Sequence, residues 1–519
     1  SIARSLESRK PGFCYHVLPA QPSHLLSGPI DSRQVVGYSV RGFPGPSLDR
    51  GDPVFRMRTR LEERNMLDLA IINGTLVTAE ATARADLGIA KGQIAAMGMG
   101  LKARETLDAA GMLVMPGAVD EHVHLQMPVG DFSSSDDFYT GTVAAACGGT
   151  TTVIDFVEPE PDQRLLAALT ARRAEAEDKA AIDYGLHMTL RQADDRTLAQ
   201  IPDTIGSGSS SFKLYMAYEG IRLNDGGFFR ALTALRAEGG RVLVHAENHH
   251  AIAYLAAQAV AEGRTGPENH PLTRPVLMEA EAIHRLLAIA GVTGTPVVLA
   301  HLSCALGLEA VRAARARGQV VWVETCPQYL LLDEREYRRP GFEGAKFVMA
   351  PPPRTEADRT ALWAGLASGE VNMVATDHCP FFFETQKTRG RENFTLIPGG
   401  APGIETRLTL TYNHGVRTGI LSLERWVEVC CTEPARRFGL PGKGTLAMGA
   451  DADVVVFDPE RQVTLAAETL HQNVDYCPYE GWQVRGYPLT VLSKGKVIVR
   501  NGDFVGTAGH GQFLHTKPL

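Results

Sequence analysis

Residues 117–125, GAVDEHVHL, open a series of eight apolar, β-branched runs in this sequence. The other seven runs are TTVIDFV (151–157), AIDYGLHMTL (181–190), SSFKLYMAY (210–218), RVLVHAE (241–247), TPVVLAHLS (295–303), VVWVETCP (320–327) and VNMVATDHCP (371–380). Between most of them lie Ala/Leu/Arg/Glu stretches with helical spacing, such as ALGLEAVRAARARG (305–318). Eight alternations of strand and helix, with nearly continuous apolar strands, predict an α/β fold of the (β/α)8 TIM-barrel type. An open doubly wound sheet is the alternative, but no Gly-rich phosphate loop follows the first run.

Shorter strand-like runs flank this middle section on both sides. LDLAIINGTLV (67–77) precedes it, and DADVVVFDP (451–459) and LTVLSKGKVIVRNGDF (489–504) follow it, with Asn-Gly and Lys-Gly turns between strands. We therefore predict a second, small β-sandwich domain built from both ends of the chain, with the barrel inserted between its halves. The expected boundaries are 66–115 and 441–500 for the β-domain, 116–440 for the barrel and 501–519 for a C-terminal tail.

The first 65 residues differ from the rest in composition. They are rich in Pro, Gly and Ser, carry a net positive charge and show neither strand nor helix periodicity. We expect residues 1–65 to be an N-terminal extension that is disordered or loosely attached. A transit peptide is the alternative, and the acidic residues and prolines count against it. Regular patterning begins at Met66, which has the character of a natural start.

The overall composition is that of an ordinary globular protein, with 44% hydrophobic residues, 21% charged residues and a net charge of −7. The mild acidity predicts no nucleic-acid partner, and the absence of a long apolar run predicts no membrane association. The eight cysteines form no C-x-x-C pair, which favours reduced thiols. We expect a cytoplasmic enzyme.

Side chains that can bind metal ions fall at the ends of the predicted barrel strands. His122 and His124 close the first run, and they are followed in later runs by Lys213, His245, His301 and Asp377. The carboxyl ends of barrel strands converge on one mouth, where active sites of this fold are built. His122 and His124 are two residues apart, so they project from one face of a strand. One such histidine would more often be an ordinary core residue, but the complete set predicts a metal centre.

Four histidines and one aspartate are more ligands than a single catalytic ion needs if it keeps an open position. Two divalent ions per chain fit better. Imidazole and carboxylate ligands favour Zn²⁺, with Mn²⁺, Co²⁺ and Fe²⁺ as alternatives. Lys213 is unusual in such a set, because an ammonium group is repelled by a cation and has no lone pair to donate.

The run D-E-H-V-H, residues 120–124, resembles the D-x-H-x-H signature of the amidohydrolase superfamily. Further motifs resemble its hydantoinase/dihydropyrimidinase branch, in family order, over residues 66–519: DDFYTGTVAAACGGTTTVIDF, SSFKLYMAYEG, LVHAEN, AHLSC, VETCPQYLLLDE, FVMAPPPR, VATDHCPF and NVDYCPYEGW. The combination is most similar to bacterial D-hydantoinases, including the phenylhydantoinase type.

This resemblance implies a role for each side chain of the set. His122, His124 and Asp377 would hold the more buried ion, and His245 and His301 the more exposed one. Lys213 would be carboxylated by CO₂ (N6-carboxylysine), and its carbamate would bridge both ions. A metal-bridging hydroxide would attack the ring amide, with Asp377 moving the proton and Tyr218 donating its phenol to the oxyanion.

The implied reaction converts 5-substituted hydantoins to N-carbamoyl amino acids, or 5,6-dihydrouracil to N-carbamoyl-β-alanine. Relatives commonly have S-P-P and P-N-G where this chain has Ala350-Pro351-Pro352 and Pro398-Gly399-Gly400. The family grips the ring amide there through main-chain groups, so Ala350 and Gly399 are expected to keep that role; the alternative is that this loop simply differs here. By family position, the exocyclic substituent would contact Met127, Val129, Phe156 and Tyr215, unless these side chains only pack the barrel.

Four other functions compete with this one. Dihydroorotases hold a carboxylate with an arginine just after H-x-H, where this chain has Leu125 and Gln126. Allantoinases lack the tyrosine that here completes K-x-x-x-x-Y, and another cyclic-imide hydrolase is a further possibility. Collapsin-response-mediator proteins are non-enzymatic scaffolds that have lost metal ligands, whereas all six are present here. The family also implies a homotetramer or a homodimer.

Overall fold

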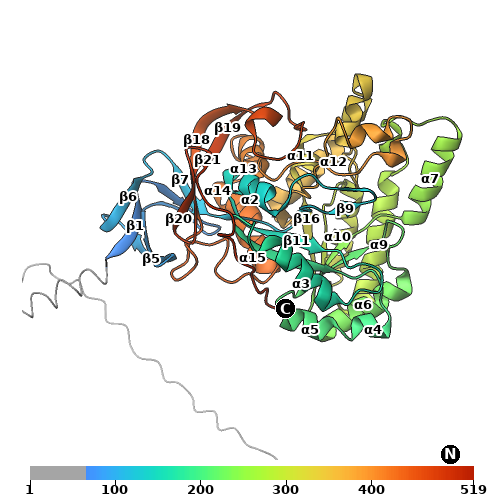
Figure 1. Ribbon diagram of the computed structural model, residues 1–519, viewed down its shortest axis with the longest axis horizontal. Helices are drawn as coiled ribbons and strands as arrows, with labels where there is room; N and C mark the ends of the chain where they lie inside the picture. Colours follow the sequence, from blue (N-terminus) through green and yellow to red (C-terminus); the bar gives the residue numbers. More distant parts are fainter. Residues whose placement is uncertain (1–65) are drawn as a thin grey trace, which may run out of the picture. The chain divides into compact units, whose positions relative to one another are not determined.

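The structure is a computed structural model that describes residues 66–519 (Figure 1). The predicted N-terminal extension, residues 1–65, lies outside the described residues. Within residues 66–519, no helix is long and apolar enough to cross a membrane.

Eight parallel strands form the central sheet, in the order β17-β16-β15-β14-β13-β12-β11-β8. Their order in space follows their order in the chain, as a barrel requires. The predicted TIM-type barrel is therefore confirmed. Its strands are β8 (Ala118–Asp120), β11 (Thr150–Val157), β12 (Asp183–Thr189), β13 (Ser211–Tyr215), β14 (Arg241–His245), β15 (Val297–Leu299), β16 (Val321–Thr325) and β17 (Met373–Val374).

The barrel closes between its first and last strands, β8 and β17. Just beyond both strands, Val123 and His378 form a parallel bridge. The fully buried guanidinium of Arg407 spans the same seam, donating from Nη1 to the carbonyls of Val119 (2.8 Å) and Val374 (2.7 Å). Strands β8 and β17 share few main-chain hydrogen bonds at this seam. The Arg407 guanidinium therefore supplies hydrogen-bond donors to carbonyls that main-chain amides of a neighbouring strand would otherwise pair with.

Helices alternate with the barrel strands and cover the outside of the sheet (Figure 1). Helix α10 shows why: Leu308, Val311 and Ala314 recur every three residues and are buried, so one apolar stripe packs inward. The helices are α2 (Phe138–Cys147), α3 (Leu165–Ala176), α4 (Asp195–Leu198), α5 (Ile201–Gly206), α6 (Asp225–Ala237), α7 (His249–Ala261), α8 (Asn269–Leu272), α9 (Val276–Thr293), α10 (Ala305–Ala316), α11 (Pro327–Leu331), α12 (Glu356–Ser368), α13 (Arg407–Thr411), α14 (Leu423–Val427) and α15 (Glu433–Arg437).

A second, sheet-rich domain is built from both ends of the described chain, as predicted (Figure 1). Strand β7 from the N-terminal part pairs antiparallel with β18 from the C-terminal part. A four-stranded sheet, β5-β4-β1-β6, accompanies a seven-stranded sheet, β21-β20-β19-β18-β7-β2-β3. Their strands are β1 (Leu67–Ile72), β2 (Thr75–Val77), β3 (Thr82–Arg84), β4 (Asp86–Ala90), β5 (Gln93–Gly98), β6 (Ala103–Asp108), β7 (Leu113–Pro116), β18 (Val454–Thr464), β19 (Gln483–Ser493), β20 (Lys496–Arg500) and β21 (Asp503–Phe504).

The C-terminal tail crosses the amino-terminal end of the barrel. Its backbone amides at Leu514 and Thr516 donate to the carbonyls of Tyr184, near the start of β12, and Gly208, just before β13. That end of the barrel is thereby covered, so the opposite, carboxyl-terminal end is the one available for a site.

Candidate metal centre and substrate cavity

The predicted metal ligands come together at the carboxyl-terminal end of the barrel. Nε2 of His122 and Nε2 of His124 lie 3.3 and 3.1 Å from the same oxygen, Oδ1 of Asp377. Nζ of Lys213, a residue of β13, lies 3.1 Å from Nε2 of His122. Four side chains from three separated stretches of sequence thus point their ligand atoms at one spot.

A second pair of ligand atoms lies beside the first group. Nδ1 of His245, the last residue of β14, is 3.0 Å from Nε2 of His301. The rings of His301 and His122 have centroids 5.3 Å apart, so the two groups are neighbours. His245 and His301 thus lie beside the group formed by His122, His124, Asp377 and Lys213.

Buried carboxylates set which ring nitrogen of each histidine carries the proton. Oε1 of Glu324 lies 2.7 Å from Nδ1 of His122, and Oε2 of Glu247 lies 2.9 Å from Nε2 of His245, so an ionised carboxylate at either position accepts from that nitrogen. The opposite nitrogens, which face the ligand groups, therefore keep their lone pairs. Burial lowers the pKa of both histidines, and that of His301, below the ordinary value, which favours neutral imidazoles. Neutral imidazoles beside a carboxylate are suitable ligands for divalent metal ions.

The side chain of Asp377 is an ionised carboxylate at neutral pH. Burial raises its pKa, but the hydrogen bond from His124 and the positive charge of Lys213 help to outweigh that effect, so the pKa lies below the usual value. An ionised carboxylate at this position can bind a cation or accept a proton.

Lys213 is buried without a counter-charge in contact. Within the described part of the chain, no carboxylate forms an ion pair with its amine, which lies over the rings of Phe156 and Tyr215 at 5.0 and 5.2 Å. Burial lowers the pKa of Lys213 to about 8. A lysine in this setting is chemically distinct from the solvated lysines of a protein surface.

Three site residues adopt left-handed backbone conformations, which side chains other than glycine rarely take. The φ angles are 72° at Tyr218, 35° at His301 and 52° at Asp377. Such strain persists where the surrounding structure over-determines the conformation, and it clusters at functional sites.

A second acidic group, formed by Asp183, Asp451 and Asp453, also has metal-like spacing. Nζ of Lys443 lies 2.6, 2.9 and 2.7 Å from these three carboxylates in turn, and Lys494 lies 2.6 Å from Asp183. The lysines already occupy the position of a cation. The group is therefore an internal salt-bridge network near the start of β12, at the end of the barrel away from the histidines.

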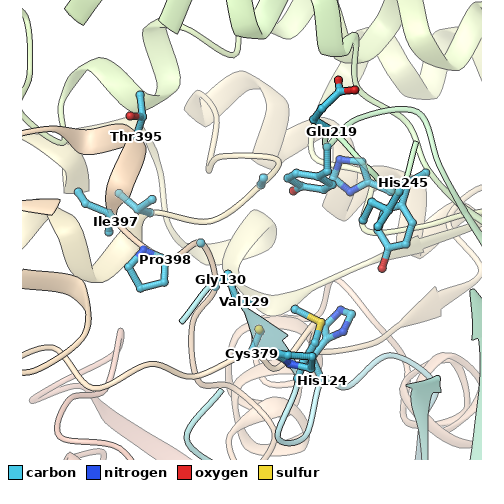
Figure 2. Close-up of a pocket in the computed structure, with 18 of the residues that line it drawn as sticks. His124, Val129, Gly130, Glu219, His245, Cys379, Thr395, Ile397 and Pro398 are labelled. Carbon is cyan, nitrogen blue, oxygen red and sulfur yellow. The ribbon is translucent and has the colours of Figure 1, made fainter. Parts of the chain in front are cut away.

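A cavity of about 720 Å³ opens over the metal-ligand groups. It is lined by all six ligand residues, and Figure 2 shows His124 and His245 on its wall with Glu219 and, farther across the view, Thr395, Ile397 and Pro398. Of the predicted substrate-contacting residues, six line the cavity: Met127, Val129, Tyr215, Tyr218, Ala350 and Gly399.

Phe156 departs from the expected position. It is not among the residues that line the cavity, and its ring stacks on His124 with centroids 4.4 Å apart. It also lies 4.9 Å from the ring of His122. Phe156 therefore supports the two histidines from the barrel interior and does not face the substituent space.

Several polar residues of the site were missed by the sequence argument. Glu158 follows β11 directly and lines the cavity, where it accepts from the hydroxyls of Thr189 (2.9 Å) and Tyr215 (3.3 Å). Like Glu247 and Glu324, it stands at the carboxyl end of a barrel strand, and this position was the signal available in the sequence. Arg274, also in the cavity wall, donates from Nη1 to Glu247 at 2.6 Å.

Comparisons of the sequence and of the fold with known proteins give consistent results. A model of the amidohydrolase family matches residues 113–498. The D-hydantoinase of Geobacillus stearothermophilus is 43% identical over 449 residues, which cover 86% of this chain and 95% of the relative. The D-phenylhydantoinase of Escherichia coli O1:K1 is 44% identical over 455 residues, covering 86% and 98%. The crystal structure of dihydropyrimidinase from Brevibacillus agri NCHU1002 aligns with a TM-score of 0.86 at 42% identity, covering 87% of this chain and 99% of that one.

Proposed function

The chain belongs to the amidohydrolase family, and we propose that it opens the ring amide of hydantoins and dihydropyrimidines with the help of two divalent metal ions. It is a hydrolase of cyclic amides, as its similarity to D-hydantoinases over 86% of the chain indicates. The observation that carries the proposal is the convergence of all six predicted ligands on the wall of one substrate-sized cavity.

The residues present fit a two-metal site. His122, His124 and Asp377 would hold the more buried ion, and His245 and His301 the more exposed one, with zinc as the expected metal. When bound, the ions would supply a water molecule of lowered pKa and a Lewis acid for the amide oxygen. The proton positions set by Glu247 and Glu324 support this assignment, because they leave lone pairs on the facing nitrogens of His245 and His122.

Carboxylation of Lys213 would account for its unusual environment. The neutral amine would add to CO₂ and release a proton to give a carbamate, so the buried group would become an anion with two oxygen ligands. The contact of 3.1 Å between Lys213 Nζ and His122 Nε2 supports this, because an unmodified lysine so placed would occupy the lone pair that His122 offers to a metal ion.

Asp377 and Tyr218 would act on opposite sides of the amide. The Asp377 carboxylate would accept a proton from the attacking water and deliver it to the departing ring nitrogen. Burial raises the pKa of Tyr218, so its phenol stays protonated and able to donate to the developing oxyanion. Its ring lies 5.0 Å from that of His245, beside the proposed exposed ion.

The ring amide would be held by the main chain at Ala350 and Gly399, and the exocyclic substituent by Met127, Val129 and Tyr215. All five residues line the cavity. Because these side chains are apolar or aromatic, we expect 5-alkyl and 5-aryl hydantoins to bind well. Assembly as a homodimer or homotetramer and a cytoplasmic location stay predictions.

The test is an assay of the purified, metal-supplemented full chain on hydantoin, a 5-aryl hydantoin, 5,6-dihydrouracil and allantoin. We expect N-carbamoyl products from the hydantoins and from dihydrouracil. Turnover of allantoin alone would show an allantoinase instead. If none of the rings opened although two ions were bound per chain, the proposed function would be wrong.

A further inference from the structure

A completely buried lysine, Lys387, lies close to the substrate cavity but belongs to no ion pair among the described residues. It begins the short 3₁₀ helix η3 (Lys387–Gly390) and is 0% exposed. Its Nζ donates to two main-chain carbonyls, those of Val348 (3.1 Å) and Pro398 (3.0 Å). Burial of an amine with no carboxylate partner is costly, so a lysine at this position calls for a specific reason.

The two carbonyls belong to the two segments that carry the proposed ring contacts. Val348 is two residues before Ala350, and Pro398 immediately precedes Gly399. The segments also touch directly, because the amide of Gly400 donates to the carbonyl of Val348 at 2.9 Å. In Figure 2, Pro398 lies in the part of the cavity wall away from Glu219 and His245. Lys387 thus joins two separate loops at one side of the substrate cavity.

Other buried donors hold the residues around Ala350. Nε2 of His270 donates to the carbonyl of Met349 (2.8 Å), and the hydroxyl of Tyr329 donates to that of Pro351 (2.9 Å). Among residues 66–519, no group donates to the carbonyl of Ala350 itself. The carbonyls on either side of it are paired within the protein, while that of Ala350, a cavity-lining residue, remains for a ligand.

Only some side chains could make the Lys387 connection. The amine must reach two acceptors from different segments at the end of a flexible, apolar stem, which a lysine provides. Burial lowers the pKa of Lys387 to about 7. A neutral amine still has two N–H bonds, so both carbonyls stay paired whether or not the lysine carries its third proton.

We propose that Lys387 is a positioning residue that holds the Ala350 and Gly399 segments at the spacing needed to grip the ring amide of the substrate. This rests on the proposed function for the identity of the ligand, although the link between the two segments is independent of it. Lys387 does not touch the substrate, and its effect is transmitted through the carbonyls of Val348 and Pro398.

The decisive variant is Lys387→Met, which keeps an apolar stem and removes the donors. With hydantoin as substrate, we expect KM to rise about tenfold or more, as for loss of buried hydrogen bonds at a binding site, with a smaller change in kcat. Metal content should equal that of the wild type. Amide hydrogen exchange should become faster in peptides covering residues 345–352 and 395–403. The reason is that the Val348 carbonyl, which accepts from the Gly400 amide, is no longer held in place by Lys387.

Arg241 provides a matched control. It is a buried cation that also donates to main-chain carbonyls, those of Lys517, Arg437 and Pro518, but at the amino-terminal end of the barrel. Arg241→Met should lower stability while leaving KM and exchange in both cavity segments unchanged. A rise in KM in this control equal to that of Lys387→Met would reduce the role of Lys387 to general stability and overturn the proposal.

Unchanged KM and unchanged exchange in Lys387→Met would also overturn it. If that variant does not fold, Lys387→Gln decides in the same way, because its amide nitrogen is one atom closer to the main chain and falls short of the position from which Nζ reaches both carbonyls. Failure of the proposed function is a separate outcome: the wild type would open no cyclic amide, while the exchange experiment would still test the link.

Discussion

Nζ of Lys213 lies 3.1 Å from Nε2 of His122, although Lys213 belongs to β13, His122 follows β8, and 91 positions separate them in the sequence. Oδ1 of Asp377 lies 3.3 Å from the same His122 nitrogen, so three polar side chains meet at this buried point. An amine can donate to the lone pair of an imidazole nitrogen, but while it does so that lone pair is not free to bind a metal ion. In the proposed function, the carbamate on Lys213 removes this competition and leaves the His122 nitrogen to a metal ion.

Lys213→Ala should therefore lose both ion binding and activity. We expect elemental analysis of the wild type to find about two divalent ions per chain, as in other two-metal hydrolases, and the variant to bind fewer. Short carboxylic acids added to the variant should restore part of its activity by replacing the carbamate. Full activity and an unchanged metal content in Lys213→Ala would show that this lysine is unmodified and dispensable.

Asp377→Asn and Tyr218→Phe should give two distinct phenotypes. The first removes both a metal ligand and the proton carrier, so turnover should fall at least about 10³-fold with altered metal content. The second removes one oxyanion donor, typically a loss of about 10²–10³-fold, and both ions should stay bound. Turnover and elemental analysis on the same samples separate the two. Normal turnover of Tyr218→Phe on every cyclic amide tested would exclude the phenol from the mechanism.

Glu247 should tune the affinity of the more exposed ion through His245. Its carboxylate accepts from His245 and from Arg274, and despite burial these partners hold its pKa below the usual range. Glu247→Gln should weaken binding of that ion by about 10–100-fold, as loss of such outer partners does in other metal sites. Titration with a chelator measures the change. Glu370→Gln, in a surface pair with Arg312, is the control and should bind both ions as the wild type does.

Arg407 should matter for stability more than for chemistry. It is fully buried across the barrel seam, with Nη2 donating to Thr150 Oγ1 (3.1 Å) and Nε 3.9 Å from Asp120. Arg407→Met leaves the Asp120 charge and two carbonyls unpaired, so the free energy of unfolding should fall by about 3–5 kcal/mol. The midpoint of urea unfolding gives the change. A midpoint equal to that of the wild type would mean that the seam closes without this side chain.

The barrel, and the meeting of the proposed ligand residues at one end of it, could be predicted because both follow from local patterns in the sequence. Apolar strand runs recur in order, and His245 and Asp377 each stand at or just after the end of one. In a parallel barrel the ends of all strands share one mouth, so position along a run translates into position in space. The same rule would have indicated Glu158, Glu247 and Glu324, had carboxylates been sought as partners of the histidines.

Phe156 is a residue whose position in space does not follow from its position along its strand. Its place near the end of β11 is compatible with the cavity, yet its ring stacks on His124 inside the barrel. Strand tilt and stagger decide which inward-facing residue lies at the mouth and which lies a layer below. These quantities depend on the whole sheet, and a single run of sequence does not contain them.

The sequence by itself determined the alternation of strands and helices, the contribution of both chain ends to the second domain, and the types and order of the side chains that meet at the mouth of the barrel. Only the tertiary structure decided which nitrogen of His122 and His245 faces the ligand groups, and that Lys387 meets both Val348 and Pro398. The physical reason is the distance along the chain over which each feature is determined. Periodicity and spacing act over a few residues, whereas a hydrogen bond between distant loops exists only after the packing of the whole barrel has brought its donor and acceptors together.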